Sequence, residues 1–80
     1  VDRQDDKDTL FEDAGRFVIE RERGSIGMLQ RKFKIGFNRA GRIMDQLSDA
    51  GVVGPEIGTK PRKVLMDKEE FEAYINSAGS

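Results

Sequence analysis

The chain has 80 residues, enough for one small domain with a single modest core and too few for a second domain. It contains no cysteine and no histidine, which excludes disulfides, thiolate or imidazole catalysis and the usual zinc ligands. The formal net charge is only −1, but acids crowd the amino-terminal end, whereas residues 23–44 carry six cations and no acid.

Residues 1–8 are polar, highly charged and without hydrophobic periodicity, which indicates a disordered linker remnant. Since the chain begins with Val rather than Met, we expect it to be a fragment of a larger protein. Apolar residues then recur at helical spacing and predict a helix over residues 9–23. Asp8 or Thr9 is the expected N-cap, and Gly24 is expected to end the helix.

Two helices joined by a tight turn are predicted next, which is the helix-turn-helix pattern. Ser25 is the expected N-cap of a helix over residues 26–33, and residues 34–36 form the turn. A second helix then runs between Gly36 and Gly51. Its apolar side holds six residues: Phe37, Ala40, Ile43, Met44, Leu47 and Ala50.

Aromatic residues at helical spacing usually pack in the core, so we expect four of the phenylalanines to be buried there. They are Phe11, Phe17, Phe33 and Phe37. After Gly51, two short runs rich in β-branched and apolar residues, 52–53 and 63–66, flank a stretch rich in turn formers and predict a small β-hairpin. Asp67 and Glu70 then have the spacing of a capping box, which predicts a short final helix.

The expected fold is therefore mainly α with a small β-hairpin. It is a winged helix-turn-helix, in which a three-helix bundle carries a wing and a short carboxyl-terminal helix. We place this domain over residues 9–76 and expect residues 77–80 to fray.

The second helix of the pair carries polar side chains on the side opposite its apolar residues. At 100° per residue, four of them fall within an arc of about 60°. We call this set the polar arc: Asn38, Arg42, Asp45 and Asp49. In a DNA major groove Asn bonds adenine, Arg bonds guanine and a carboxylate accepts from cytosine. We therefore predict that Asn38, Arg42 and Asp45 read bases.

Seven cations beside this helix or in the hairpin suit DNA phosphates, which fix the register of a protein on DNA without reading sequence. They are Arg31, Lys32, Lys34, Arg39, Lys60, Arg62 and Lys63. One alternative is that the polar arc is only a solvated helix face with an internal Arg42–Asp45 pair. Another is that the winged helix is a protein-interaction module, in which this helix face or the wing binds a partner protein. The near-neutral charge favours this alternative, which predicts weak DNA binding without sequence preference.

We do not expect an enzyme, because the chain has no nucleophile–base pair, metal cluster or phosphate-binding loop. No apolar run is long enough to cross a bilayer, and no signal-peptide pattern is present, so we expect a cytoplasmic domain without direct membrane contact.

The run from Gly24 to Met66, GSIGMLQRKFKIGFNRAGRIMDQLSDAGVVGPEIGTKPRKVLM, closely resembles the γ domain of the FtsK/SpoIIIE family of bacterial DNA translocases. The motifs LQR-F-IG-NRA-R, AG-VGP and PR-VLM carry the resemblance. It assigns the family's base-reading Asn and Arg to Asn38 and Arg42, and the acidic reader to Asp45, where some members have Glu. Gly41 stands where the family usually has Ala.

This resemblance implies a winged helix that recognises short, G-rich, strand-asymmetric octamers in double-stranded DNA. The octamers orient a hexameric ATPase motor that moves DNA in chromosome segregation. Some members of the family also act on a tyrosine recombinase, which the resemblance implies as a second partner. From the residues we expect no cofactor and no metal. Because a single small reader with few base contacts binds weakly, we expect several copies of the domain per DNA site. The parent protein is expected to be anchored in the bacterial membrane.

Overall fold

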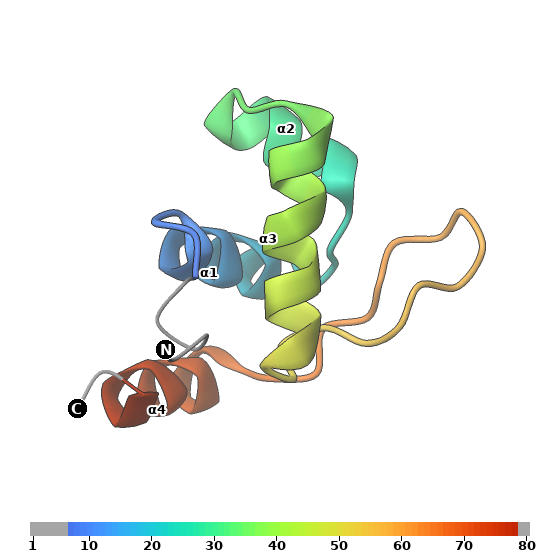
Figure 1. The fold of residues 1–80 in the computed structure, drawn as a ribbon. Helices are drawn as coiled ribbons and strands as arrows, with labels where there is room; N and C mark the ends of the chain where they lie inside the picture. Colours follow the sequence, from blue (N-terminus) through green and yellow to red (C-terminus); the bar gives the residue numbers. More distant parts are fainter. Residues whose placement is uncertain (1–6, 79–80) are drawn as a thin grey trace.

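The computed structural model describes residues 7–78 and is mainly helical within that range, as predicted (Figure 1). Its elements in chain order are α1 (Phe11–Arg21), α2 (Ile26–Phe33), α3 (Phe37–Asp49) and α4 (Lys68–Ala78). Residues 1–6 of the predicted linker and residues 79–80 of the predicted frayed end lie outside the described residues.

In Figure 1, α3 runs through the middle of the molecule, with α2 across its amino-terminal end. Helices α1 and α4 lie on one side of α3, and the segment from residue 52 to residue 66 projects on the other side. Between residues 7 and 78 the backbone has no continuous strand pairing and forms three isolated antiparallel bridges. They join Gly24 to Arg62, Val53 to Val64, and Ile57 to Lys60.

Helix α1 ends at a different residue from the one that the sequence predicts. Glu22, with φ 61°, is the left-handed residue that closes the helix, and its N–H bonds the Ile19 carbonyl at 3.1 Å. Gly24 is instead buried and bridged to Arg62, so the prediction that it ends the helix is wrong. The small size of Gly24 instead lets the chain pack closely against Val53, because a Cβ at this position would lie 3.2 Å from Val53 Cγ1.

The side-chain caps predicted for α2 and α4 are confirmed, whereas α1 begins after Leu10, which makes no side-chain cap, so the prediction of Asp8 or Thr9 as its N-cap is wrong. The Ser25 hydroxyl accepts a hydrogen bond from the Met28 N–H at 3.3 Å and begins α2. At α4, the Asp67 N–H donates to Glu70 Oε1 at 2.9 Å, and the Glu70 N–H donates to Asp67 Oδ1 at 2.7 Å, which completes the capping box. Helix α4 continues to Ala78, past residue 76, where we expected the domain to end.

The core lies where the four helices and the start of the projecting segment meet. Its most deeply buried large side chains come from all of these parts: Val18, Leu29, Ile43, Met44, Leu47, Val52, Val53 and Phe71. Phe71 attaches α4 to α1, because it is fully buried and its ring centroid lies 5.9 Å from that of Phe11. The core therefore joins all four helices and packs against one side of α3.

One of the four phenylalanines expected in the core is not there. Phe37 is 63% exposed, whereas Phe11 is buried, and Phe17 and Phe33 are half-buried in an edge-to-face pair. Phe37 is the first residue of α3 and lies at the edge of its apolar side, beyond the end of the core. The prediction of its burial fails because helical periodicity gives the direction of a side chain but not how far the core extends along the helix.

Candidate nucleic-acid interface

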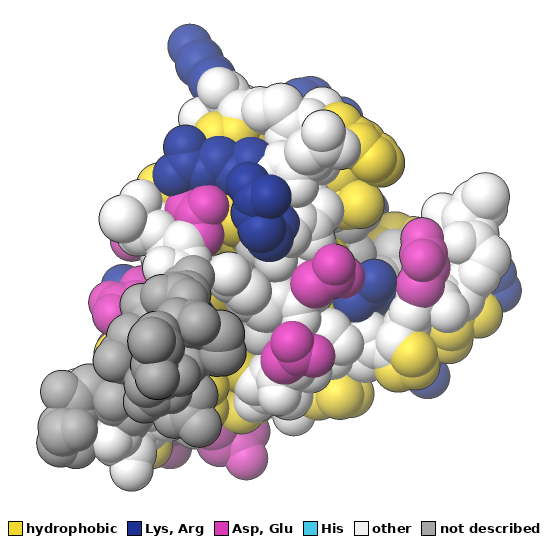
Figure 2. Space-filling view, viewed as in Figure 1, with side chains coloured by type: hydrophobic (Ala, Val, Ile, Leu, Met, Phe, Trp, Pro, Cys, Tyr) yellow, Lys and Arg dark blue, Asp and Glu magenta, His cyan; other side chains and the backbone are white. Residues whose placement is uncertain are grey.

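Helix α3 separates its apolar and polar side chains sharply. Its four buried residues, each at most 1% exposed, are Ala40, Ile43, Met44 and Leu47. All four residues of the polar arc are exposed. On the face shown in Figure 2, basic side chains lie over the upper half of α3 and acidic side chains over its lower half. The core thus fixes one side of the helix and leaves the polar arc open to a ligand.

The side chains predicted to read bases have free hydrogen-bonding groups. Among residues 7–78, the side chains of Asn38, Arg42 and Asp45 make no hydrogen bond or ion pair. The internal Arg42–Asp45 pair of the alternative interpretation is therefore not formed. From Asn38 to Asp45 the helix advances about 10 Å, close to the length of about three base-pair steps. An amide, a guanidinium and a carboxylate are therefore presented in a row that matches a short stretch of major groove.

Arg39, one of the predicted phosphate contacts, already has an anionic partner. Its Nε donates to Asp8 Oδ2 and its Nη2 to Asp8 Oδ1, both at 2.9 Å. The Asp8 N–H in turn donates to Gln46 Oε1 at 2.9 Å. Asp8, which we placed in the linker, is thus attached to two residues of α3. A phosphate that contacts Arg39 has to compete with this carboxylate.

Each charge of this pair shifts the pKa of the other. The hydrogen bond from Arg39 holds the pKa of Asp8 below its ordinary value of 3.8, partly opposed by burial of the carboxylate, whose side chain is only 11% exposed. The same hydrogen bond raises the pKa of Arg39. Both groups are therefore charged at neutral pH, and the pair neutralises one of the cations beside the polar arc.

The other six predicted phosphate contacts fall into two groups. The first group lies on the end of α2 and in the turn that leads into α3: Arg31, Lys32 and Lys34. All three are exposed, and Lys32 Nζ lies 5.4 Å from the centroid of the Phe17 ring. The second group lies on the projecting segment: Lys60, Arg62 and Lys63. Of these, Arg62 is half-buried, and its N–H donates to the Gly24 carbonyl at 2.7 Å.

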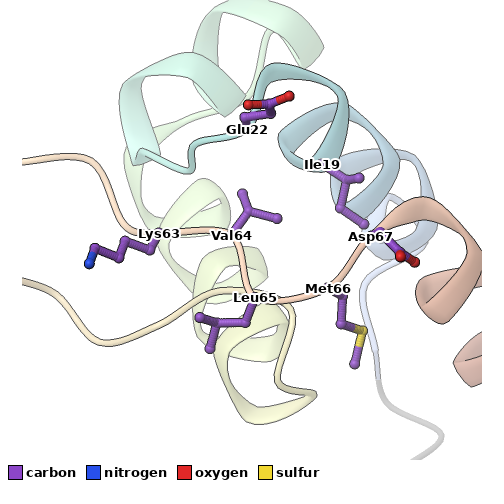
Figure 3. A pocket seen from close by; sticks show the side chains of 7 residues that line it. All are labelled: Ile19, Glu22, Lys63, Val64, Leu65, Met66 and Asp67. Atoms are coloured by element: carbon purple, nitrogen blue, oxygen red, sulfur yellow. The ribbon is translucent and has the colours of Figure 1, made fainter.

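A groove between the end of α1 and the chain entering α4 has a different character (Figure 3). It is lined by Ile19, Glu22, Lys63, Val64, Leu65, Met66 and Asp67. The lining is mostly aliphatic and includes Lys63 but no residue of the polar arc. Among the described residues no cluster of His, Cys, Asp or Glu could hold a metal, and no helix is long and apolar enough to cross a membrane. The polar arc is therefore the surface with the clearest recognition chemistry.

Sequence reasoning missed two residues at this surface, Asp8 and Phe37. Asp8 is separated from Arg39 by 31 positions, and no local pattern indicates such a pairing. For Phe37 a signal was present, because a residue in the first turn of a helix has fewer neighbours than one in the middle.

The structure thus defines a small, mainly helical domain whose third helix presents a row of polar side chains opposite the core. The family model described as the FtsK gamma domain matches residues 5–67. The chain belongs to this family.

Proteins similar to this chain over most of its length are named DNA translocase FtsK. One, from Streptococcus pyogenes serotype M3, is 57% identical over 58 residues, which is 72% of this chain and 7% of that protein. Another, from Staphylococcus epidermidis strain RP62A, is 47% identical over 74 residues, or 90% of this chain and 9% of that protein. A third, from Clostridium acetobutylicum, is 47% identical over 66 residues, or 82% of this chain and 9% of that protein. The chain spans less than a tenth of the length of these relatives.

Proposed function

We propose that this domain is a winged helix-turn-helix that binds double-stranded DNA in a sequence-specific manner. The observation that supports this proposal best is the polar arc, whose three base-reading side chains are exposed and make no side-chain hydrogen bond or ion pair among the described residues. They lie on the helix that follows a tight turn, which is the position of the recognition helix in helix-turn-helix proteins. The bridges Val53–Val64 and Ile57–Lys60 are consistent with a wing formed by the projecting segment.

Three side chains of the polar arc have roles that follow from their chemistry. Arg42 bonds guanine O6 and N7, Asn38 bonds adenine N6 and N7, and Asp45 accepts from cytosine N4. Asp45 also repels bases that offer no donor, so it contributes to discrimination as well as to contact. The cations of α2, the turn and the wing bind phosphates on either side of the groove.

We further propose that the sites are short, G-rich and strand-asymmetric, and that reading them gives a DNA translocase its direction during chromosome segregation. The names of the relatives support the link to a translocase. The domain then works on the cytoplasmic side of a parent protein anchored in the membrane, and in some settings it activates a tyrosine recombinase. It is not itself an enzyme in this proposal, since DNA recognition needs no catalytic group or cofactor.

The first test compares two duplexes of equal composition, one with a G-rich polar octamer and one with the octamer scrambled. Fluorescence anisotropy at fixed salt measures binding of the intact chain to each duplex. We expect the octamer to be preferred, and we expect Arg42→Ala to lose about 1–3 kcal/mol of that preference. Arg31→Ala is the matched control, since loss of a phosphate contact weakens binding to both duplexes equally.

Equal, weak binding of the unaltered chain to both duplexes would contradict sequence recognition and direct attention to protein partners. A domain with so few base contacts binds weakly alone, so we propose that several copies act together on one octamer. Sedimentation of protein–DNA mixtures at rising ratio should then pass beyond one chain per site, and saturation at one chain would exclude this arrangement.

A further inference from the structure

Phe37 is the most exposed of the large hydrophobic side chains in the described part of the chain. It is 63% exposed, compared with 58% for Leu65 and 54% for Ile57. No aromatic ring contact involves it within residues 7–78. The residue one turn further along α3, where a ring usually finds an apolar partner, is Gly41, which has no side chain to offer. The ring is therefore available to a ligand.

The position of Phe37 makes DNA its best-fitting ligand. Phe37 is the first residue of α3 and directly precedes Asn38, and the amino-terminal residues of a recognition helix are those that contact base edges. At 100° per residue it lies between the buried side of the helix and the polar arc, about 20° from Met44 and about 80° from Asp45.

We propose that Phe37 contacts the 5-methyl group of a thymine in the major groove and so determines specificity at that position. This inference rests on the proposed function and adds a residue to it. Thymine alone among the four bases carries a methyl group in the major groove, and a phenylalanine ring is one of the apolar groups that contact it. The adenine assigned to Asn38 pairs with a thymine, so a methyl group lies within the base pair that the neighbouring side chain reads.

The experiment removes the methyl group without changing any hydrogen bond. A duplex that the intact chain enriches from a random-sequence pool is synthesised with each thymine replaced in turn by uracil, and the Kd of each version is measured. We expect one replacement to weaken binding about fourfold, which is the effect of returning one methyl-sized apolar group to water. Phe37→Ala should bind the thymine and uracil versions equally, whereas Phe37→Leu should retain part of the difference.

The controls separate this inference from the proposed function. Leu65→Ala, which truncates another exposed apolar side chain, should keep the full thymine preference, and melting curves verify that each variant is folded. Sequence enrichment without any uracil effect would overturn the role of Phe37 alone. The same would follow if Phe37→Ala remained as sensitive to uracil as the unaltered chain. A chain that enriches no sequence would overturn both the proposed function and this inference.

Discussion

At the scale of single residues, the pair of Asp8 and Arg39 connects the start of the described chain to α3. The carboxylate makes two hydrogen bonds to the guanidinium, and its Oδ1 also accepts from the Leu10 N–H at 2.9 Å. Asp8 therefore both shapes the turn before α1 and holds that turn against α3. A purely local interpretation assigns this residue to a linker, because its partners become visible only in the folded chain.

This pair predicts how stability depends on pH. The hydrogen bond from Arg39 lowers the pKa of Asp8 in the folded state below its ordinary value of 3.8. The stabilisation is thus fully present above the unfolded-state pKa and is lost as the pH falls through the lowered folded-state pKa. Asp8→Asn should lower the melting midpoint at neutral pH by up to about 5 °C and have little effect well below the ordinary pKa.

Thermal melting followed by circular dichroism at both pH values measures this difference. Glu20→Gln is a suitable control, because it removes an exposed acid that has no ion pair among the described residues. A cost of Asp8→Asn that is the same at both pH values would show that the carboxylate charge does not contribute through this pair.

At the scale of elements, replacing either of two helical glycines by alanine should change the stability of the domain, and we expect the two changes to have opposite signs. A Cβ at Gly41 in α3 would lie 3.7 Å from Ile26 Cδ1, an ordinary van der Waals contact with α2. Gly41→Ala should therefore stabilise the domain by up to about 1 kcal/mol through helix propensity alone. At Gly15 in α1, a Cβ would lie only 2.7 Å from Phe71 Cε1, within the packing of α1 against α4.

Gly15→Ala should consequently destabilise the domain by about 1–3 kcal/mol, despite the same gain in helix propensity. Urea unfolding of both variants beside the unaltered chain measures the two effects. Stabilisation by both substitutions would mean that α4 can shift away from α1 at little cost. Destabilisation by Gly41→Ala would mean that α2 and α3 pack more closely than the structure indicates.

The elements also show which signals in the sequence determine structure by themselves. Helix α2 and the start of α4 depend on caps formed within three residues, Ser25 to Met28 and Asp67 to Glu70, and both were predictable. The polar and apolar sides of α3 follow from periodicity. The end of α1 was not predictable in the same way. Gly24 is buried and bridged to Arg62, and the left-handed residue that ends the helix is Glu22.

At the scale of the whole molecule, the arrangement of charge explains how a domain of net charge −1 can suit DNA. Two acids are paired with cations across elements: Asp8 with Arg39 beside α3, and Glu72 with Arg16 between α4 and α1 at 2.6 Å. The cations at the end of α2 and in the following turn have no acidic partner within residues 7–78. Net charge therefore understates the positive potential next to the amino-terminal end of α3.

This arrangement predicts a specific salt dependence. If Lys34 binds a phosphate, Lys34→Gln should weaken binding to the G-rich and scrambled duplexes equally and reduce the slope of log Kobs against log salt by about one unit. Lys68→Gln, which removes an exposed cation from the first position of α4, should leave both quantities unchanged. Anisotropy titrations at several salt concentrations give the slopes. A selective loss on the G-rich duplex would instead make Lys34 a base reader, and an unchanged slope would place the turn between α2 and α3 away from the DNA backbone.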